Sequence, residues 1–144
     1  MMKILGLDLG SKTIGVAISD DLFLTAQVLT SIQRTTLEKD LTVIVDLVEQ
    51  YGVEEIVVGM PINMDGSAGE SARRAEVFIE KLRETFSFKI IPWDERLSTV
   101  AAERILLEGD LSRKKRRKVI DRLSAAIILQ GYLDSRPRNS GRPL

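Results

Sequence analysis

Four carboxylates occupy apolar stretches of this chain, where acidic side chains are uncommon. Asp8 lies in ILGLDLG, Asp94 and Glu95 end FKIIPWDE, and Asp121 lies in VIDRLSAAIIL. Burying an unpaired carboxylate costs free energy, so each should have a cation, a hydrogen-bond donor or a metal beside it. If the acids converge in the fold, Mg²⁺ is a suitable partner, since it takes carboxylates, waters and phosphate oxygens as ligands. Two such ions about 3.5–4 Å apart can support the hydrolysis of a phosphodiester.

Each acid also has a purely structural interpretation. Asp8 could brace a hairpin turn, and Asp94 and Glu95 could be solvated charges at the end of a strand. Asp121 could pair with Lys118 or Arg122 near the start of a helix, where acidic residues are favoured. Because neighbouring side chains of a strand point to opposite faces, only one of Asp94 and Glu95 is expected to face a shared site.

The residue types that the chain lacks narrow the chemistry further. Its 144 residues include no cysteine and no histidine, which excludes disulfides, thiolate nucleophiles, Ser-His-Asp catalysis and most transition-metal sites. Carboxylates, lysines, arginines, hydroxyls or a hard metal ion on oxygen ligands remain. The length and the 44% hydrophobic content predict one soluble domain. No apolar run approaches the roughly 20 residues of a membrane span, and no secretory signal is evident, so we expect a cytoplasmic protein.

The formal net charge is zero, but the charges are unevenly distributed. Residues 1–72 carry 4 basic and 11 acidic side chains, net −7, whereas residues 73–144 carry 17 basic and 10 acidic, net +7. The basic half contains an uninterrupted run of cations: Arg113, Lys114, Lys115, Arg116, Arg117 and Lys118. Such a run directly before a helix with a candidate metal ligand favours contact with a phosphate backbone, without base specificity. A solvated face is the alternative interpretation.

Three further residues are candidates for binding nucleic acid. Lys12 in GSKT lies in a predicted turn, and it is either an ordinary turn lysine or a phosphate contact. The stretch is not a P-loop, because Ser11 separates Gly10 from Lys12. Asn63 lies in the loop PINMDGSAGE after a strand, where α/β sheets line ligand crevices, or it belongs to a plain connecting loop. Arg96 follows the acids of the DER motif and is expected to help to hold the phosphate backbone of the nucleic acid.

Hydrophobic periodicity predicts the elements that must position these residues. Five strands are expected, at residues 3–9, 13–19, 26–34, 54–60 and 88–93. Four helices are expected, at residues 37–51, after residue 70, at 98–108 and at 119–133. The spacing of Ser67 and Glu70 predicts a capping box for the second helix. A single domain over 1–135 and a disordered basic tail over 136–144 complete the prediction.

The order of these elements predicts the sheet. Three adjacent strands with short links indicate an antiparallel meander, and later strands that alternate with helices indicate right-handed parallel crossovers. The expected fold is α/β, with a five-stranded mixed sheet flanked by helices. This arrangement resembles the ribonuclease H-like fold.

Four motifs resemble the YqgF/RuvX-like family across residues 3–135. They are ILGLDLGSKTIGVAISD, VVGMPINMDGSAGE, PWDERLSTVAAE and KKRRKVIDRLSAAIILQGYLDS, in this order. Members are described as Holliday junction resolvases or as nucleases that mature the 5′ end of the small-subunit (16S) ribosomal RNA precursor. The resemblance implies a Mg²⁺ or Mn²⁺ site at Asp8, at Glu95 with Asp94 as the fallback, and at Asp121. It also implies nucleic acid as the partner and favours a role in bacterial ribosome biogenesis.

Two other classes of function remain open. The stretch Asp8-Leu9-Gly10-Ser11-Lys12 looks like the first phosphate loop of sugar kinases, actin and chaperone ATPases, which would indicate a nucleotide-binding phosphotransferase. Those proteins use two such domains, however, and this sequence contains no second loop of the kind. A non-catalytic RNA-binding assembly factor would use the basic half and leave the acids structural. A resolvase that cuts both strands of a junction needs two sites, so we expect a monomer or a weak homodimer, according to the substrate.

Overall fold

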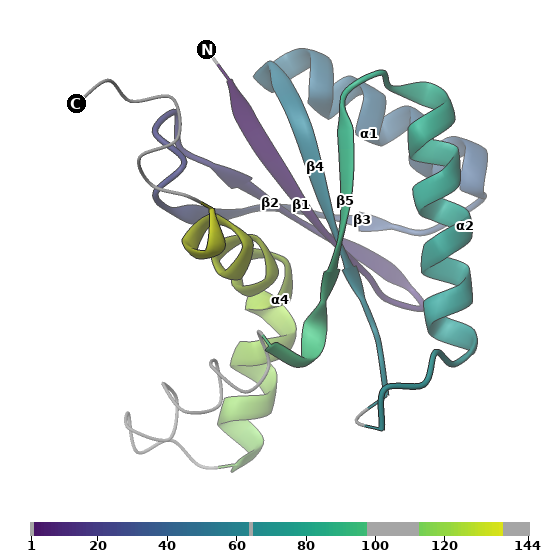
Figure 1. Ribbon diagram of the computed structural model, residues 1–144, viewed down its shortest axis with the longest axis vertical. Coiled ribbons are helices and arrows are strands. Elements are labelled where there is room, and N and C mark those ends of the chain that lie inside the picture. Colours follow the sequence, from purple (N-terminus) through teal and green to yellow (C-terminus); the bar gives the residue numbers. More distant parts are fainter. Residues whose placement is uncertain (1, 64, 98–112, 137–144) are drawn as a thin grey trace.

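The computed structural model describes residues 2–63, 65–97 and 113–136, and the side chains of residues 113–122 lie outside this description (Figure 1). The strands are β1 (Lys3–Leu9), β2 (Thr13–Ser19), β3 (Ala26–Gln33), β4 (Val53–Met60) and β5 (Lys89–Asp94). The helices are α1 (Leu37–Tyr51), α2 (Glu70–Thr85) and α4 (Arg113–Ser135). The five predicted strands are confirmed to within one residue at each end.

The strands form one mixed sheet in the order β3-β2-β1-β4-β5. β1 pairs antiparallel with β2, and β2 with β3, which confirms the predicted meander. β4 pairs parallel with β1, and β5 pairs parallel with β4, as expected for strands that alternate with helices. Because these three strands are parallel neighbours, the carboxyl ends of β1, β4 and β5 meet at one end of the sheet, where α/β proteins place their sites.

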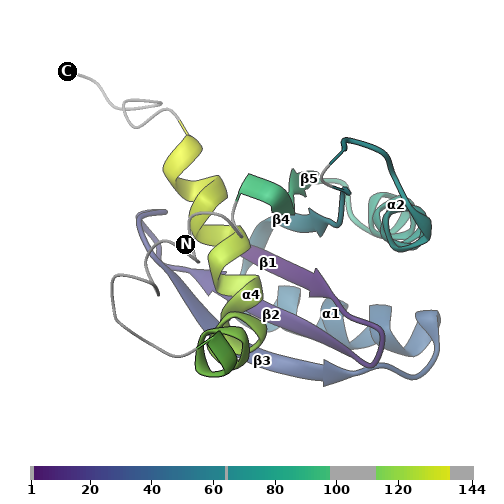
Figure 2. The same ribbon diagram turned by 90° about the horizontal axis from the view of Figure 1, so that it is seen from below.

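The two faces of the sheet are covered by different helices (Figure 1). α1 and α2 pack on one face over the larger hydrophobic cluster, to which β1 contributes Leu5 and Leu7. α4 lies on the other face and contacts β1, β2, β3 and β4 (Figure 2). β1 contributes Ile4 to this smaller cluster, because alternate side chains of a strand point to opposite faces. Asp8 shares the parity of Ile4 and therefore lies on the α4 face.

The ends of α1 and α2 follow local chemistry. Thr36 caps α1 by accepting a hydrogen bond from the backbone N–H three residues later, at 3.2 Å. Gly52 ends the helix with a φ of 67°, in the left-handed region, as predicted. The predicted capping box of α2 is wrong, because Gly69 is the N-cap and makes no side-chain hydrogen bond. Ser67 Oγ instead donates to Asp65 Oδ1 at 2.6 Å, because an aspartate two residues earlier closes a local turn.

α4 is longer than predicted. It begins at Arg113 rather than at residue 119, so the basic run is helical and Asp121 lies about two turns inside the helix. Lysine and arginine are strong helix formers, but a prediction based on the spacing of apolar residues cannot detect a helix in a run of basic residues. The predicted helix at 98–108 lies outside the described residues. Within the described part of the chain, no helix is long and apolar enough to cross a membrane.

Polar contacts hold the C-terminal half of α4 on the sheet. The Gln130 side chain makes two hydrogen bonds of 2.9 Å to the backbone. It accepts one from the N–H of the first residue of β3 and donates the other to the carbonyl oxygen two residues before that strand. The Tyr132 hydroxyl donates to the Glu55 carboxylate of β4, and Arg136 donates to the same carboxylate at 3.1 Å. Arg136 is thus in contact with the domain, although the sequence assigned it to the tail, and residues 137–144 lie outside the described residues.

Candidate active site

Asp8 lies at the carboxyl end of β1, next to α4. It pairs with Gly15 across the antiparallel ladder. A Cβ on Gly6 would lie 2.8 Å from Leu129 Cβ, so this glycine lets α4 approach β1 closely. A Cβ on Gly15 would lie 3.5 Å from Ala125 Cβ and 3.7 Å from Asp8 Cβ. The Asp8 side chain is therefore positioned where α4 meets the first two strands.

Glu95 directly follows β5, and its side chain lies over β4. A Cβ built on Gly59 would lie 3.0 Å from Glu95 Cγ, 3.1 Å from its Cδ and 2.6 Å from Ile128 Cδ1. β4 separates β1 from β5 in the sheet. The missing side chain at Gly59 therefore leaves the space in which the Glu95 carboxyl group lies, on the same face as Asp8.

The carboxylates of this site act on one another. The pKa of Glu95 is raised to about 7, first by burial and then by the negative charges of Asp8 and Asp94. Like charges disfavour ionisation unless a cation offsets them. The donors are carboxylate oxygens, which Mg²⁺ and Mn²⁺ accept as ligands. The donor set and the repulsion between its members both fit a hard divalent cation.

Asp94 has a different partner. Arg96 Nε lies 3.0 Å from both carboxylate oxygens of Asp94, and Nη2 lies 2.6 Å from Oδ2. These charge-assisted hydrogen bonds from Arg96 lower the pKa of Asp94. The two neighbouring acids therefore differ in role: Asp94 is held by an arginine, whereas Glu95 is partly buried over Gly59.

Asp121 is carried by the turn of α4 that precedes these contacts. Leu129 contacts the middle of β1, and Ala125, one turn earlier, contacts Gly15, the ladder partner of Asp8. Residues four apart share a helix face, so position 121 continues this line towards the carboxyl end of β1. The side chain of Asp121 lies outside the described residues. We use the term acidic site for Asp8, Glu95 and position 121.

The two described carboxylates do not form a complete metal-binding group by themselves. Among the residues that the structure describes, no group of three or more acidic side chains could hold a metal ion. The acidic site would reach three acids only with Asp121.

The residues predicted to bind nucleic acid lie in three places. Lys12 is exposed in the turn between β1 and β2. Asn63 is exposed in the loop between β4 and α2, where its side-chain amide donates to Ser67 Oγ at 3.1 Å. Arg96 holds Asp94 and donates to the Asn63 carbonyl oxygen at 3.4 Å, so it braces this loop. The backbone of the basic run forms the first turns of α4, but the following side chains lie outside the described residues: Lys114, Lys115, Arg116, Arg117 and Lys118.

Comparison with known proteins assigns the family. The family model for RuvX, described as "Holliday junction resolvase", matches residues 2–135. The chain belongs to the RuvX family. A relative from Desulforamulus reducens, named "Putative pre-16S rRNA nuclease", is 55% identical over 134 residues, which cover 93% of this chain and 98% of the relative. A relative of the same name from Geobacillus kaustophilus is 56% identical over 137 residues, which cover 94% and 99% of the two chains.

Solved structures share the fold of this RuvX protein at low sequence identity. RuvC of T. thermophilus, in complex with a Holliday junction substrate, matches with a TM-score of 0.57 at 13% identity, over 92% of this chain and 94% of RuvC. The yeast mitochondrial Holliday junction resolvase Ydc2 matches with a TM-score of 0.55 at 13% identity, over 90% and 77% of the two chains. These likenesses concern the fold, and they confirm the predicted ribonuclease H-like architecture.

Gly59 is the residue of this RuvX site to which the sequence assigned no role. The available signal is a glycine near the end of the otherwise apolar run EEIVVGM, because a glycine within a strand often marks close approach by another group. The sequence does not indicate which group approaches. Only the packing of β5 and α4 against β4 shows that Glu95 and Ile128 are the neighbours.

Proposed function

We propose that this RuvX protein is a metal-dependent endonuclease that hydrolyses phosphodiester bonds in structured RNA and processes the 5′ end of pre-16S rRNA. The observation that carries the proposal is the pair of Asp8 and Glu95 on one face of the sheet, with the pKa of Glu95 raised to about 7. Family membership over residues 2–135 and the name shared by close relatives support the same function. A role in ribosome biogenesis agrees with the cytoplasmic location expected from the sequence.

The acidic site supplies suitable ligands for Mg²⁺ or Mn²⁺. Asp8, Glu95 and Asp121 would hold the ion through their carboxylate oxygens. Bound there, the ion supplies Lewis-acid stabilisation for the charge on a phosphodiester and makes water more acidic. This chemistry needs neither histidine nor cysteine, which agrees with a chain that has none of either.

Other features of the chain hold the acids and contact the substrate backbone. The antiparallel ladder fixes the backbone at Asp8, and packing over Gly59 and against Ile128 limits the positions open to the Glu95 side chain. Lys12 in the exposed turn and the basic run at the start of α4 neutralise backbone phosphates near the site. Because α4 carries both the run and Asp121, binding of the backbone is coupled to the placement of one acid.

A junction-resolving DNA endonuclease is the second candidate. The description of the family model, "Holliday junction resolvase", favours it. Resolution of a junction requires cleavage of two strands and hence two acidic sites in a dimer. Processing of one RNA end requires a single site, so a monomer or a weak homodimer suffices for the RNA function.

The test is a cleavage assay with three labelled substrates. These are a pre-16S rRNA fragment that spans the 5′ processing site, a duplex RNA and a four-way DNA junction, each with Mg²⁺, Mn²⁺ or EDTA. Asp8→Asn and Asp121→Asn are expected to slow cleavage by about a hundredfold or more, as when an electrostatic group is removed from an active site. Asp46→Asn, the same change at an exposed position of α1, is the matched control and should cleave as fast as the wild type.

Each result separates the candidates. Cleavage by Asp8→Asn at the wild-type rate would show that the acidic site is not the catalytic centre. Preferred cleavage of the junction would assign the resolvase function. Tight, salt-sensitive RNA binding without cleavage, unchanged in both variants, would assign a non-catalytic assembly factor. Saturable protection by ATP in a thermal-shift assay would instead support a nucleotide-binding phosphotransferase.

A further inference from the structure

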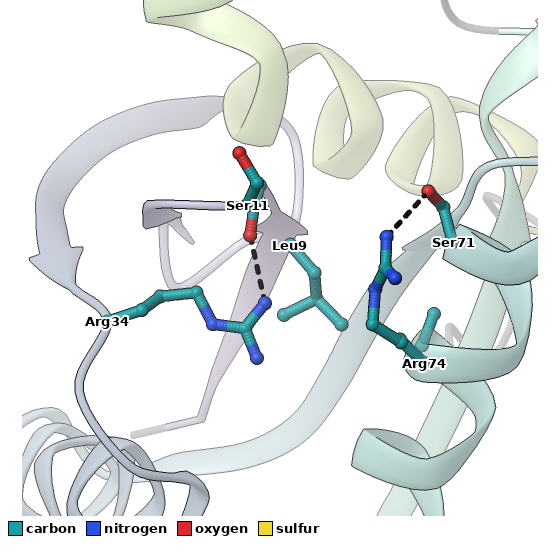
Figure 3. Close-up of a pocket in the computed structure, with 7 residues that line it drawn as sticks. Leu9, Ser11, Arg34, Ser71 and Arg74 are labelled. Atoms are coloured by element: carbon teal, nitrogen blue, oxygen red, sulfur yellow. Dashed lines mark hydrogen bonds between the residues drawn. The ribbon is translucent and has the colours of Figure 1, made fainter.

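A small open cavity lies at the carboxyl end of β1, on the face that carries α1 and α2. It has a volume of about 70 Å³ and is lined by the β1–β2 turn, by the segment after β3 and by the start of α2. Figure 3 shows the guanidinium groups of Arg34 and Arg74 on either side of Leu9, with Ser11 and Ser71 beside them. The space suits several waters or one phosphate-sized group.

Arg34 is held firmly at this cavity. Its Nη1 donates to the Gly10 carbonyl oxygen at 2.9 Å, and its Nε lies 3.6 Å from Asp40 Oδ2. Asp40 is only 2% exposed, and its other oxygen accepts a hydrogen bond from the Thr35 backbone N–H at 3.1 Å. A guanidinium carries five N–H donors, of which these contacts use only a part. Arg34 is therefore a preorganised cation, and some of its N–H donors remain available to a ligand.

Arg74 is held more loosely. It donates to Ser71 Oγ at 3.2 Å, and its ion pair with Glu70 spans 4.0 Å between side chains that are 61% and 85% exposed. An ion pair in water contributes little free energy, so an incoming anion can replace Glu70 at small cost. Arg74 can therefore turn towards a ligand that Arg34 already holds.

The charges around the cavity favour an anion. Two arginines from segments far apart in the sequence meet there, together with two serine hydroxyls. Of the acids that contact these arginines, Asp40 is buried and Glu70 is exposed to water. A planar guanidinium matches the geometry of phosphate oxygens and binds them through paired hydrogen bonds.

We propose that this arginine pocket, formed by Arg34, Arg74, Ser11 and Ser71, binds a backbone phosphate of the nucleic-acid substrate. The inference rests on the nuclease function proposed above and adds a second point of contact. Asp8 and the arginine pocket lie at the same end of β1, on opposite faces of the sheet. A strand that passes around the β1–β2 turn thus places one phosphate at the acidic site and another, a few nucleotides away, in the arginine pocket.

The test compares neighbouring arginines of α2. Arg74→Gln removes the adaptable cation of the pocket, and Arg73→Gln makes the same change of charge about 100° around the helix. Affinity for the labelled pre-16S rRNA fragment is measured by fluorescence anisotropy in EDTA, at several salt concentrations. Arg74→Gln should weaken binding by about five- to tenfold and reduce the slope of log affinity against log salt by about one. Arg73→Gln should change the affinity less than about twofold.

Two further measurements test whether the group bound in the pocket is a phosphate. Arg34→Lys keeps the charge but removes the planar fork, so it should also weaken binding. Substrates with one neutral methylphosphonate link, moved one position at a time, should include a position that weakens binding by the wild type but not by Arg74→Gln. That position identifies the phosphate in the pocket. Duplex DNA with the same substitutions shows whether the pocket also accepts deoxyribose backbones.

The outcomes distinguish this inference from the nuclease proposal. If Arg74→Gln and Arg34→Lys both bind like Arg73→Gln, and no methylphosphonate position separates them from the wild type, the pocket does not bind the backbone. Cleavage of the same RNA in Mg²⁺ is measured separately. Its absence, together with the predicted binding differences, would overturn the nuclease function and retain the arginine pocket as a phosphate site.

Discussion

The two faces of the sheet are filled in different ways. On the face of α1 and α2, large side chains such as Leu7 and Phe78 are at most 1% exposed, and the hydrophobic cluster is extensive. On the α4 face, Gly6 and Gly59 allow the helix to approach the strands, and the cluster is smaller. The carboxylates of the proposed site lie on this second face, beside the glycines.

The difference shows how one sheet separates stability from chemistry. Large apolar side chains give most of the burial that stabilises the domain, and where they pack they leave no room for a catalytic carboxylate. Glycines bury little, but they leave a gap in which a carboxylate can be held at a fixed position. Charge repulsion in that gap destabilises the fold, which is a common feature of functional sites.

The largest effect on stability is expected from the filled face. Phe78→Ala removes a large, fully buried side chain of α2 and should lower the free energy of unfolding by about 3–5 kcal/mol. Val77→Ala, at the neighbouring position, which is 54% exposed, should change it by less than about 0.5 kcal/mol. Urea unfolding of both variants measures the difference. A loss of less than 1 kcal/mol for Phe78→Ala would refute the role assigned to this face.

The second prediction concerns the gap on the α4 face. Gly59→Ala introduces a Cβ 3.0 Å from Glu95 Cγ and 2.6 Å from Ile128 Cδ1. The isoleucine end can rotate away, but the Glu95 side chain must move by a few tenths of an ångström, and misplacement of a reacting group slows the reaction. Nuclease assays under matched metal should therefore show a loss of activity of about tenfold, with a stability loss of about 1–3 kcal/mol.

Gly69→Ala is the control for this substitution. Its Cβ would lie 3.5 Å from the nearest atom, Asn63 Nδ2, which is an ordinary contact. This variant should cleave at the wild-type rate. Equal activity of Gly59→Ala and Gly69→Ala would mean that the position of Glu95 is not critical for cleavage.

The third prediction uses the raised pKa of Glu95. The pKa of Glu95 is about 7 in the folded protein, above its ordinary value of 4.5. The stability that the protonated Glu95 side chain contributes is therefore fully present below pH 4.5 and is lost as the pH rises through 7. Glu95→Gln removes the ionised form. In EDTA at pH 8, the variant should be more stable than the wild type by on the order of 1–2 kcal/mol, after solvent screening, and the gain should vanish near pH 4.

Asp94→Asn is the matched comparison, because Arg96 lowers the pKa of Asp94. This group contributes stability above its unfolded pKa and loses it as the pH falls, so the substitution should destabilise the protein at pH 8 and have little effect in acid. Thermal unfolding from pH 4 to pH 8 measures both variants. Two profiles of the same sign would contradict the separate roles of the two acids.

The smallest effect is expected where α4 is fastened to the sheet. Tyr132→Phe removes the hydrogen bond to Glu55 and should lower the free energy of unfolding by about 1 kcal/mol. Arg136 still holds Glu55, which limits the loss. Tyr51→Phe is the control, since the described residues give its hydroxyl no hydrogen bond. Equal denaturation midpoints for the two variants would show that the Tyr132 contact does not stabilise α4.

Local patterns predicted most of the fold. The strands are correct to within one residue, because alternating residues and short apolar runs are both patterns of consecutive residues. The end of α1 at Gly52 was predictable for the same reason. The start of α4 was not, because the basic run lacks an apolar signal although it favours a helix. The capping box failed because Asp65 competes for Ser67, and spacing alone cannot decide between two local partners.

The site was predictable in its chemistry but only partly in its composition. Residue types excluded imidazole and thiol catalysis and singled out acids in apolar surroundings. Pattern alone left Asp94 and Glu95 as alternatives. It did not reveal the role of Gly59, because that role depends on the two segments that pack over the glycine.

The sequence alone was enough to place the strands along the chain, to exclude histidine and cysteine chemistry, and to name the acids available for an oxygen-ligand site. These properties reside in residue identity or in spacings of a few positions. The packing of the elements was needed to show that Glu95 lies over Gly59 while Asp94 is held by Arg96, and that Arg34 meets Arg74 at one cavity. Apart from the local pair of Asp94 and Arg96, these contacts join residues that are far apart in the chain, and they depend on how the helices pack on the two faces of the sheet, which no local pattern encodes.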